Sequence, residues 1–306
     1  MKALLPGGDA GATVVAGRVP EPEPRPDEAL IKVEAFSVNR GETFLLEDPP
    51  PGWRPGKDVA GLVVQAAADG SGPTAGRRVV GHPPQAGWAE YATVPSHSLA
   101  ELPDSVTTVQ AAALPLAGLT ALRLLRTAGE VTGRRILITG ASGGVGHYFT
   151  ELAARACAQV TAVTRDRDRG RRLAELGAAE VVHGLADARG PFDLVLESTG
   201  GRAFAEALEL LAPAGTLIWF GQASREPVTV NFFDLLAGAR SATIRHFAYV
   251  DSDTPYGEDL ATLVRLTATG RLHPEIGLVA DWSATADTIT ALRGRRVRGN
   301  AVLTLT

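Results

Sequence analysis

The chain has 306 residues, which exceeds the size of one typical hydrophobic core, so we expect two domains. Hydrophobic residues make up 45% of it and charged residues 21%, the balance of an ordinary globular protein. The net charge of -4 argues against nucleic acid or an anionic membrane surface as a partner.

The cysteine count and the first residues bear on location. Cys157 is the only cysteine, which excludes an intrachain disulfide and a zinc cluster built on cysteines. Pro6 and several glycines interrupt the start of the chain, so it does not resemble the apolar segment of a signal peptide. No stretch approaches the roughly 18 apolar residues of a membrane-spanning helix. We therefore expect a cytoplasmic protein.

The first 115 or so residues predict a small antiparallel β domain, because short β-branched runs alternate there with glycine and proline turns. The predicted strands are 28–38, 58–67, 77–82 and 88–94. The stretch "PEPEPRP" (20–26) is either an exposed loop between strands or a polyproline ligand, and we favour the loop.

From residue 104 onward the pattern becomes helical and then alternates between strands and helices. "DSVTTVQAAALPLAGLTALRLLRTAG" predicts helices, with Asp104 or Ser105 as the cap. Six strands follow at 135–140, 158–165, 180–184, 193–199, 215–221 and 241–249, and helices at 144–157, 168–176, 202–211 and 232–239. Strands that are apolar on both faces and alternate with helices predict a doubly wound parallel sheet, hence an α/β protein.

The last 50 or so residues predict two more helices and two more strands. One helix is expected at 257–269 and another after a cap at Ser283. The strands are expected near "EIGLVA" (275–280) and at "NAVLTLT" (300–306).

The stretch "ITGASGGVGHYFT" places Gly140, Gly143, Gly144 and Gly146 where a strand turns into a helix. Glycines there can serve only the tight turn, since glycine tolerates positive φ. Alternatively they form a phosphate cradle, in which the backbone approaches a pyrophosphate at the positive end of the helix. Because the glycines begin a strand–helix–strand unit of the right length, we favour a dinucleotide site.

The end of the second strand of this unit indicates which dinucleotide binds. NAD-binding proteins usually place an acidic residue there to bind the ribose 2′-hydroxyl. This chain has Thr164 and Arg165 instead, with Arg169 in the helix that follows. Guanidinium groups bind phosphate in a bidentate manner, which favours NADPH, although the arginines can also be a solvated helix face diluted by Asp166 and Asp168.

Several motifs resemble the zinc-independent branch of the medium-chain dehydrogenase/reductase superfamily, the quinone oxidoreductase and enoyl reductase group. They are "AFSVNRGE" (35–42), "PGKDVAGLVV" (55–64), "GRRVVGHPPQAGWAEYATVP" (76–95), "AAALPLAGLTAL" (111–122), "TGASGGVG" (139–146), "RLAELGAAEVV" (172–182) and "FDLVLESTGG" (192–201). The resemblance implies a GroES-like substrate domain at 1–117, a Rossmann NADPH-binding domain at 118–249, and a segment, 250–306, that returns to the GroES-like domain.

The resemblance also bears on zinc and on the reaction. Zinc-containing members carry a Cys and a His-Glu pair where this chain reads Ser37-Val38-Asn39 and Lys57-Asp58, and their four-cysteine lobe is missing. We therefore expect no metal. Without a Lewis acid, hydride addition to a polarised C=C or a quinone is favoured over alcohol oxidation. A tailoring reductase acting on a bulky polyketide-like substrate, or a cofactor-binding protein without redox turnover (a sensor or a non-redox cyclase), remains the alternative.

By the same resemblance, Asn39 and Thr120 line the nicotinamide pocket and shape hydride transfer. The full set of predicted cofactor-binding residues is Asn39, Thr120, Ser142, Gly143, Gly144, Val145, Thr164, Arg165, Arg169, Thr199, Phe220, Gly221, Gln222 and Asn300. Two positions depart from the family, which often has Tyr where Gly184 stands and Lys where Asn300 stands. Both departures could weaken cofactor binding.

The proton donor and the oligomeric state are less clearly indicated. Tyr249 and Tyr256 are candidate proton donors by chemistry alone, as are Tyr91, Lys57, His82 and His246, and for each we favour a structural role. In this family the proton can come from solvent.

The sixth strand, 241–249, should be a sheet edge, and relatives pair this edge two-fold, so we expect a homodimer.

Overall fold

The computed structural model describes residues 1–8 and 13–305 and divides into two compact units. Unit 1 comprises Met1–Leu119 and Asp253–Thr306, and unit 2 comprises Thr120–Ser252. The divisions fall close to the boundaries expected at 117/118 and 249/250. Each unit has its own sheets and its own core.

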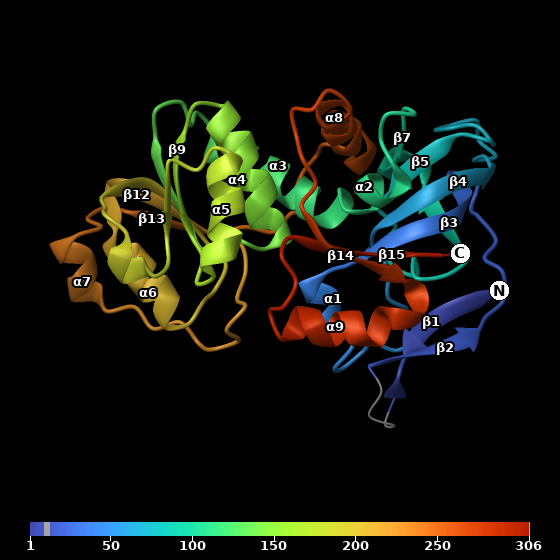
Figure 1. Ribbon diagram of the computed structural model, residues 1–306, viewed down its shortest axis with the longest axis horizontal. Helices are drawn as coiled ribbons and strands as arrows, with labels where there is room; N and C mark the ends of the chain where they lie inside the picture. The colour runs from blue at the N-terminus through green and yellow to red at the C-terminus, as the bar shows by residue number, and fades with distance from the viewer. Residues whose placement is uncertain (9–12, 306) are drawn as a thin grey trace. The chain divides into compact units, whose positions relative to one another are not determined.

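Unit 1 is built on a seven-stranded sheet in the order β14-β15-β3-β4-β5-β7, with β6 paired to β3 (Figure 1). The strands are β3 (Glu28–Val38), β4 (Val59–Gln65), β5 (Arg78–Gly81), β6 (Tyr91–Pro95), β7 (Leu99–Glu101), β14 (Ile276–Asp281) and β15 (Asn300–Thr304). A separate antiparallel pair contains β1 (Lys2–Pro6) and β2 (Val14–Arg18). The strands from the first 115 or so residues pair antiparallel, as predicted for that part of the chain, whereas β14 and β15 from the C-terminal segment run parallel to each other.

Helices cover the sheet of unit 1 and enclose its core. They are α1 (Arg40–Leu45), α2 (Thr108–Ala112), α8 (Tyr256–Ala268) and α9 (Thr285–Arg293), while α3 (Pro115–Ala128) begins in unit 1 and ends in unit 2. In the core, Phe36 stacks on Trp88 with ring centroids 5.5 Å apart. The indole Nε1 of Trp88 donates to the Ser37 carbonyl oxygen at 3.0 Å, which satisfies the one polar atom of a fully buried ring. This bond fixes the end of β3 from which α1 departs.

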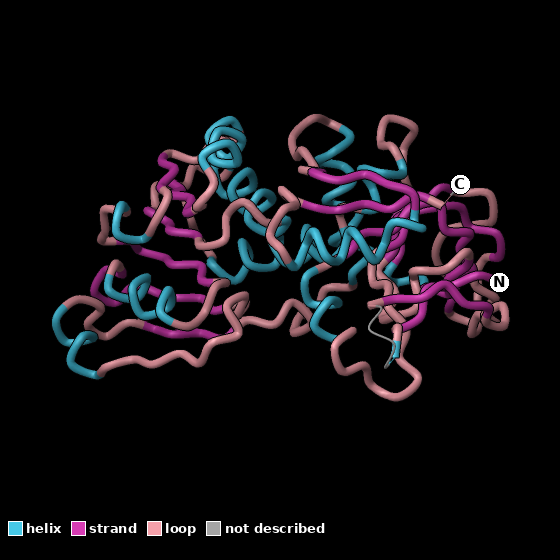
Figure 2. Tube along the Cα trace, turned by 60° about the horizontal axis from the view of Figure 1, so that its bottom comes forward, coloured by secondary structure: helices cyan, strands magenta, loops and turns pink. Residues whose placement is uncertain are grey.

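Unit 2 is a six-stranded parallel sheet in the order β10-β9-β8-β11-β12-β13, and Figure 2 shows its strands running side by side. The strands are β8 (Arg135–Ile138), β9 (Gln159–Val163), β10 (Glu180–Val182), β11 (Phe192–Glu197), β12 (Leu211–Trp219) and β13 (Thr243–His246). The helices that connect them are α4 (Gly144–Arg155), α5 (Arg167–Glu175), α6 (Arg202–Glu209) and α7 (Phe232–Ala237). Every pairing in this sheet is parallel, which confirms the predicted doubly wound α/β fold.

Helix caps differ from the sequence predictions. The cap of α2 is Thr107, whose side-chain oxygen accepts from the Gln110 backbone N–H, so the prediction of Asp104 or Ser105 is wrong. Ser283 lies in a short 3-10 turn, and its N–H and hydroxyl both donate to Asp281. The helix α9 therefore begins only at Thr285. In both places a side chain a few residues from the predicted cap, Thr107 or Asp281, accepts the hydrogen bond from a backbone N–H.

The predicted strand 241–249 is too long. β13 runs only from Thr243 to His246, because Ser241 has a φ of 57° and the chain turns again after Phe247. It is nevertheless the edge strand of the sheet, as predicted. No helix in the described part of the chain is long and apolar enough to cross a membrane.

Candidate functional site

The carboxyl ends of the parallel strands of unit 2 form one edge, at which most predicted cofactor residues gather. Strand β9 lies on one side of β8 and β11 on the other, so the loops that follow β8 and β11 diverge. In doubly wound sheets this switch point opens the crevice in which nucleotides bind. The turn that follows β8 carries Ser142 and Gly143, and Gly144 and Val145 are the first two residues of α4.

The glycine turn fits the pyrophosphate of a dinucleotide. Gly140 has a φ of 62°, a conformation that side chains disfavour, and its carbonyl accepts from Gly143 N–H at 3.0 Å. Gly143 is the N-cap of α4 and provides no side chain there. The first N–H groups of α4 have no carbonyl within the helix to bind, and they lie at its positive end. The turn therefore offers backbone donors and space to an anion.

A buried carboxylate holds the loops of this edge together. Glu197, the last residue of β11, accepts from the Thr139 hydroxyl at 3.0 Å, from Thr199 N–H at 2.7 Å and from Gly200 N–H at 2.9 Å. Burial raises its pKa, against these hydrogen bonds, which lower it. Ser198 N–H in turn donates to the Thr139 hydroxyl oxygen at 2.9 Å. The loops after β8 and β11 are thus fixed to each other.

Sequence reasoning missed Glu197, Thr139 and Ser198. The available signal was the run "DLVLEST", in which an acidic residue ends a strand that is otherwise buried. A carboxylate in such a position needs partners, and loop N–H groups at a strand end are the nearest ones. Thr199, which was predicted, lies in this loop, and its carbonyl accepts from Ser224 N–H at 2.7 Å.

The end of β9 presents one buried and one exposed candidate. The side chain of Thr164 is buried, and its carbonyl oxygen lies 2.9 Å from the His183 ring Nδ1. Arg165 is exposed. Arg169 lies on α5 with its Nε 3.2 Å from Asp166 Oδ2, and Asp166 also caps that helix. Arg169 is therefore partly neutralised by a carboxylate, which makes Arg165 the stronger candidate for a phosphate.

The loop after β12 has fewer backbone groups to offer than expected. The N–H of Phe220 donates to the Glu197 carbonyl at 2.9 Å, and the carbonyl of Gly221 accepts from the Trp219 indole at 2.6 Å. The Gln222 side chain donates to the Glu226 carbonyl at 2.8 Å. A predicted contact to a nicotinamide carboxamide would thus depend on the remaining groups, among them Gly221 N–H and the Phe220 carbonyl.

Two further candidates belong to unit 2. Thr120 lies on α3 and is buried. Tyr249 lies in the turn after β13, and its carbonyl accepts from the Arg123 guanidinium at 2.7 Å. The carbonyl bond fixes the backbone of Tyr249 and provides no sign of a proton-donating role.

Unit 1 contains a buried polar cluster that the sequence did not reveal. Asn39 is the N-cap of α1, Glu42 lies in the first turn of that helix, Asp58 precedes β4 and His82 follows β5. All four side chains are buried. Asp58 Oδ2 accepts from Asn39 Nδ2 at 2.6 Å, and Asp58 Oδ1 lies 3.3 Å from His82 Nδ1. Asn39 thus contacts the carboxylates of Asp58 and Glu42, and His82 joins this cluster through Asp58.

Glu42 is a buried carboxylic acid of this cluster whose pKa is shifted. Its carboxylate accepts from Gly56 N–H at 2.9 Å, from Lys57 N–H at 3.0 Å and from Asn39 N–H at 3.2 Å. Burial, and then the charge of Asp58, raise its pKa to about 7, although the hydrogen bonds oppose the shift.

The raised pKa of Glu42 predicts a pH-dependent stability. The folded protein binds this proton more tightly than the unfolded chain, so its contribution is complete below about pH 4.5 and is lost as the pH rises to about 7. The loss amounts to about 3 kcal/mol of unfolding free energy. In Glu42→Gln, the unfolding free energy measured with urea should no longer change with pH between about 4.5 and 7. Glu47→Gln, at an exposed glutamate, should keep the pH dependence of the parent. A parental slope in Glu42→Gln would contradict the assignment.

Tyr256 and Asn300 also belong to unit 1. Tyr256 begins α8, and its ring meets the His82 ring edge-on with centroids 4.9 Å apart. The side chain of Asn300 is buried, and its amide donates to the Glu275 carbonyl oxygen at 3.1 Å. Asn300 thus joins β15 to the segment before β14, which is a structural role.

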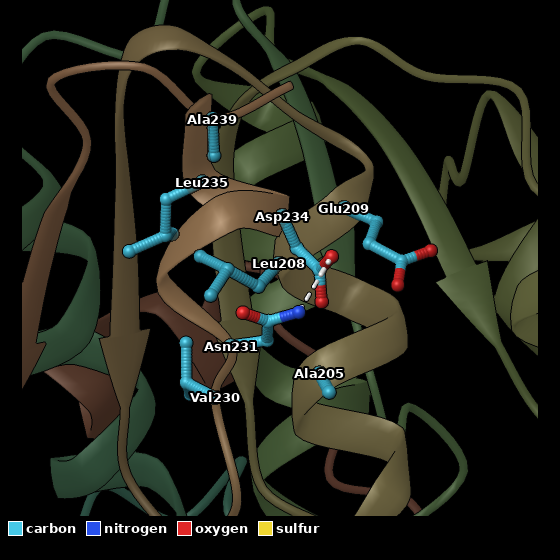
Figure 3. A pocket seen from close by; sticks show the side chains of 8 residues that line it. All are labelled: Ala205, Leu208, Glu209, Val230, Asn231, Asp234, Leu235 and Ala239. Atoms are coloured by element: carbon cyan, nitrogen blue, oxygen red, sulfur yellow. Dashed lines mark hydrogen bonds between the residues drawn. The ribbon is translucent and has the colours of Figure 1, made fainter. Parts of the chain in front are cut away.

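A shallow hollow lies between α6 and α7, away from these candidates (Figure 3). It is lined by Ala205, Leu208, Glu209, Val230, Asn231, Asp234, Leu235 and Ala239. Asn231 Nδ2 donates to Asp234 Oδ1 at 3.3 Å, at the start of α7. None of the predicted site residues lines the hollow, so we do not include it in the candidate site.

Comparison with known proteins relates both units to dehydrogenase families. Residues 25–104 match the alcohol dehydrogenase GroES-like domain, and residues 144–268 match the zinc-binding dehydrogenase family. The chain is 36% identical to a chloroplast envelope quinone oxidoreductase homolog of Arabidopsis thaliana over 65% of the chain and 63% of that relative, which is under two thirds of its length. It is 29% identical to human quinone oxidoreductase over 84% of the chain and 82% of that protein.

Solved structures agree with these similarities. The mycobacterial protein Rv1454c, in complex with NADPH, superimposes with a TM-score of 0.89 at 26% identity over 99% of both chains. Quinone oxidoreductase of Escherichia coli, also with NADPH, gives a TM-score of 0.87 at 21% identity over 99% of both chains, which bears on the fold alone.

Proposed function

Because the chain belongs to the medium-chain dehydrogenase/reductase superfamily, as a quinone oxidoreductase-like member, we propose that it transfers hydride from NADPH to a quinone or to an electron-poor C=C of an enone or enoyl group, without zinc. The observation that carries this proposal is the glycine turn between β8 and α4, at the switch point of a parallel sheet. The similarity to quinone oxidoreductases supports the oxidoreductase class, and the electron acceptor is the finer part of the proposal.

NADPH is the cofactor, and the residues that would hold it follow from the candidate site. Backbone N–H groups of the glycine turn would bind the pyrophosphate, and Arg165 the 2′-phosphate. Glu197 fixes the loops that flank this turn. When bound, NADPH supplies the hydride, and one further proton completes the reduction of a quinone to a hydroquinone. Since no proton donor is evident, we propose that solvent provides that proton.

The arrangement of possible zinc ligands supports a zinc-independent reaction. No group of three or more His, Cys, Asp or Glu side chains in residues 1–8 and 13–305 could hold a metal ion. Asp58 and His82 are bound to each other, and Asp58 also receives hydrogen bonds from Ser37 and Asn39. A metal at this position would have to displace these bonds.

Oxidation of NADPH against a panel of quinones and enones tests the proposal. We expect turnover with at least one class, unchanged by a chelator, in protein without stoichiometric zinc by elemental analysis. Turnover restricted to bulky polyketide-like enones would favour a tailoring reductase. NADPH binding without turnover on any acceptor would favour a sensor or non-redox cyclase instead.

We also propose a cytoplasmic homodimer that forms through β13. This strand is a sheet edge, and Ile244 on it is 45% exposed. An edge strand leaves backbone groups unpaired, and a two-fold axis lets two such edges pair. Light scattering after gel filtration should give about twice the 31.9 kDa of one chain. Ile244→Asp should shift the mass toward one chain, whereas Val64→Asp, at a similarly exposed valine of unit 1, should not. A parental mass of one chain would contradict the dimer.

A further inference from the structure

Thr139, the residue before the glycine turn, binds the end of β11 with all of its polar atoms. Its buried hydroxyl donates to Glu197 Oε1 at 3.0 Å and accepts from Ser198 N–H at 2.9 Å. Its backbone N–H donates to the Leu196 carbonyl at 3.0 Å, and its carbonyl accepts from the Ser198 hydroxyl at 3.1 Å. A single threonine thus joins the carboxyl ends of β8 and β11.

Glu197 extends this link to the loop after β11. Its Oε1 also accepts from Thr199 N–H at 2.7 Å, and its Oε2 accepts from Gly200 N–H at 2.9 Å. Both carboxylate oxygens are therefore needed as acceptors. A Gln side chain has only one acceptor oxygen, so in Glu197→Gln either Thr199 N–H or Gly200 N–H would face the side-chain NH2 group.

The glycine turn lies directly against this loop. A Cβ on Gly140 would lie 2.6 Å from Ser198 Oγ, which is itself held by the Thr139 carbonyl. The Gly140 carbonyl in turn accepts from Gly143 N–H at 3.0 Å, and Gly143 is the N-cap of α4. The position of Thr139 therefore sets that of the backbone N–H groups at the start of α4.

We infer that Thr139 is a positioning residue, whose hydroxyl, held by Glu197, fixes the glycine turn in the conformation that binds the pyrophosphate of NADPH. The inference rests on the proposed function, in which this turn binds that pyrophosphate. Both side chains are buried, so they act on the cofactor through the backbone of the turn and not by contact. Position 139 then requires a hydroxyl, which Ser provides and Val, of the same shape as Thr, does not.

Titration with two ligands separates positioning from a general loss of fold. Thr139→Val should weaken NADPH binding about tenfold, because the turn loses its hydrogen-bonded anchor. Adenosine 2′-monophosphate has no pyrophosphate and depends on the end of β9, so its affinity, measured by calorimetry, should stay within about twofold of the parent. Thr139→Ser retains the hydroxyl and should bind NADPH within about threefold of the parent.

Thr161→Val makes the same chemical change elsewhere in the sheet. Thr161 is a buried residue of β9, and its hydroxyl lies 3.4 Å from Glu180 Oε2. Its replacement should leave the affinities for both ligands unchanged. Glu197→Gln should show the same difference between the two ligands as Thr139→Val, and it takes the place of that variant if circular dichroism shows that Thr139→Val does not fold.

Hydrogen exchange tests the link without any ligand. The backbone amides of Thr199 and Gly200, followed by NMR, should exchange at least about tenfold faster in Glu197→Gln than in the parent, because one of them loses its acceptor. In Thr161→Val they should exchange at the parental rate. Parental exchange of both amides in Glu197→Gln would overturn the link between the two strand ends.

The binding outcomes separate this inference from the proposed function. Parental NADPH affinity in a folded Thr139→Val, or equal losses for NADPH and adenosine 2′-monophosphate, would overturn the positioning role. Thr139→Ser binding NADPH as weakly as Thr139→Val would overturn the role of the hydroxyl. If the parent itself does not bind NADPH, the proposed function fails, while the exchange measurement still decides whether Glu197 holds the loop.

Discussion

Arg165→Ala is expected to erase most of a preference for NADPH over NADH, which in the parent should be at least about tenfold, or 1.4 kcal/mol. The residue follows β9, where an NAD-binding protein would carry an acid, and its exposed guanidinium can pair with the 2′-phosphate. The measurement is the dissociation constant of each dinucleotide. NADH binding should stay nearly unchanged, because NADH has no 2′-phosphate.

The control for Arg165 is another arginine of the same segment. Arg171 lies on α5, is 77% exposed and forms an ion pair with Asp168, so Arg171→Ala removes the same charge six residues further along the chain. It should keep the parental preference, apart from a small loss from long-range attraction that salt screens. Equal affinity of the parent for both dinucleotides, or equal losses in the two variants, would contradict the role of Arg165.

Gly146→Ala is expected to destabilise the protein by about 3 kcal/mol. A Cβ at this position would lie 2.4 Å from the Ala141 carbonyl oxygen and 2.5 Å from the Ala141 Cα. Both are backbone atoms that cannot rotate away, so the strand-to-helix turn would have to open. Thermal or urea unfolding monitored by circular dichroism measures the loss.

The neighbouring Gly143→Ala is the matched control. Its Cβ would come no closer than 3.4 Å to the Gly140 carbonyl oxygen, and its φ of −84° suits any residue. Its unfolding free energy should stay within about 1 kcal/mol of the parent. NADPH affinity should nevertheless fall about tenfold, because the methyl group takes space next to the proposed pyrophosphate. Parental stability in Gly146→Ala, or parental affinity in Gly143→Ala, would contradict this reading of the turn.

The fold class and most of the helices and strands could be predicted from the sequence. Strands that are apolar on both faces and alternate with helices predicted the succession of elements along unit 2, and the glycines predicted the turn before α4. Both patterns depend only on residues that are close together in the sequence. Element ends were less predictable. β13 stops at His246 and α9 starts at Thr285, since caps and turns depend on which side chain reaches a free backbone group.

The roles of the buried polar residues, in contrast, became evident only from their contacts in the folded chain. Glu197 reads as one acid at the end of a strand, yet it fixes Thr139 and the loop after β11. Asn39 and Glu42 lie in one motif (35–42) and Asp58 lies in another (55–64), and no local pattern indicates that both carboxylates bind one amide. Contacts between residues distant along the chain form only when strands pair and a buried charge must find donors. The physical role of a buried polar side chain is therefore set by its partners, which the sequence does not name.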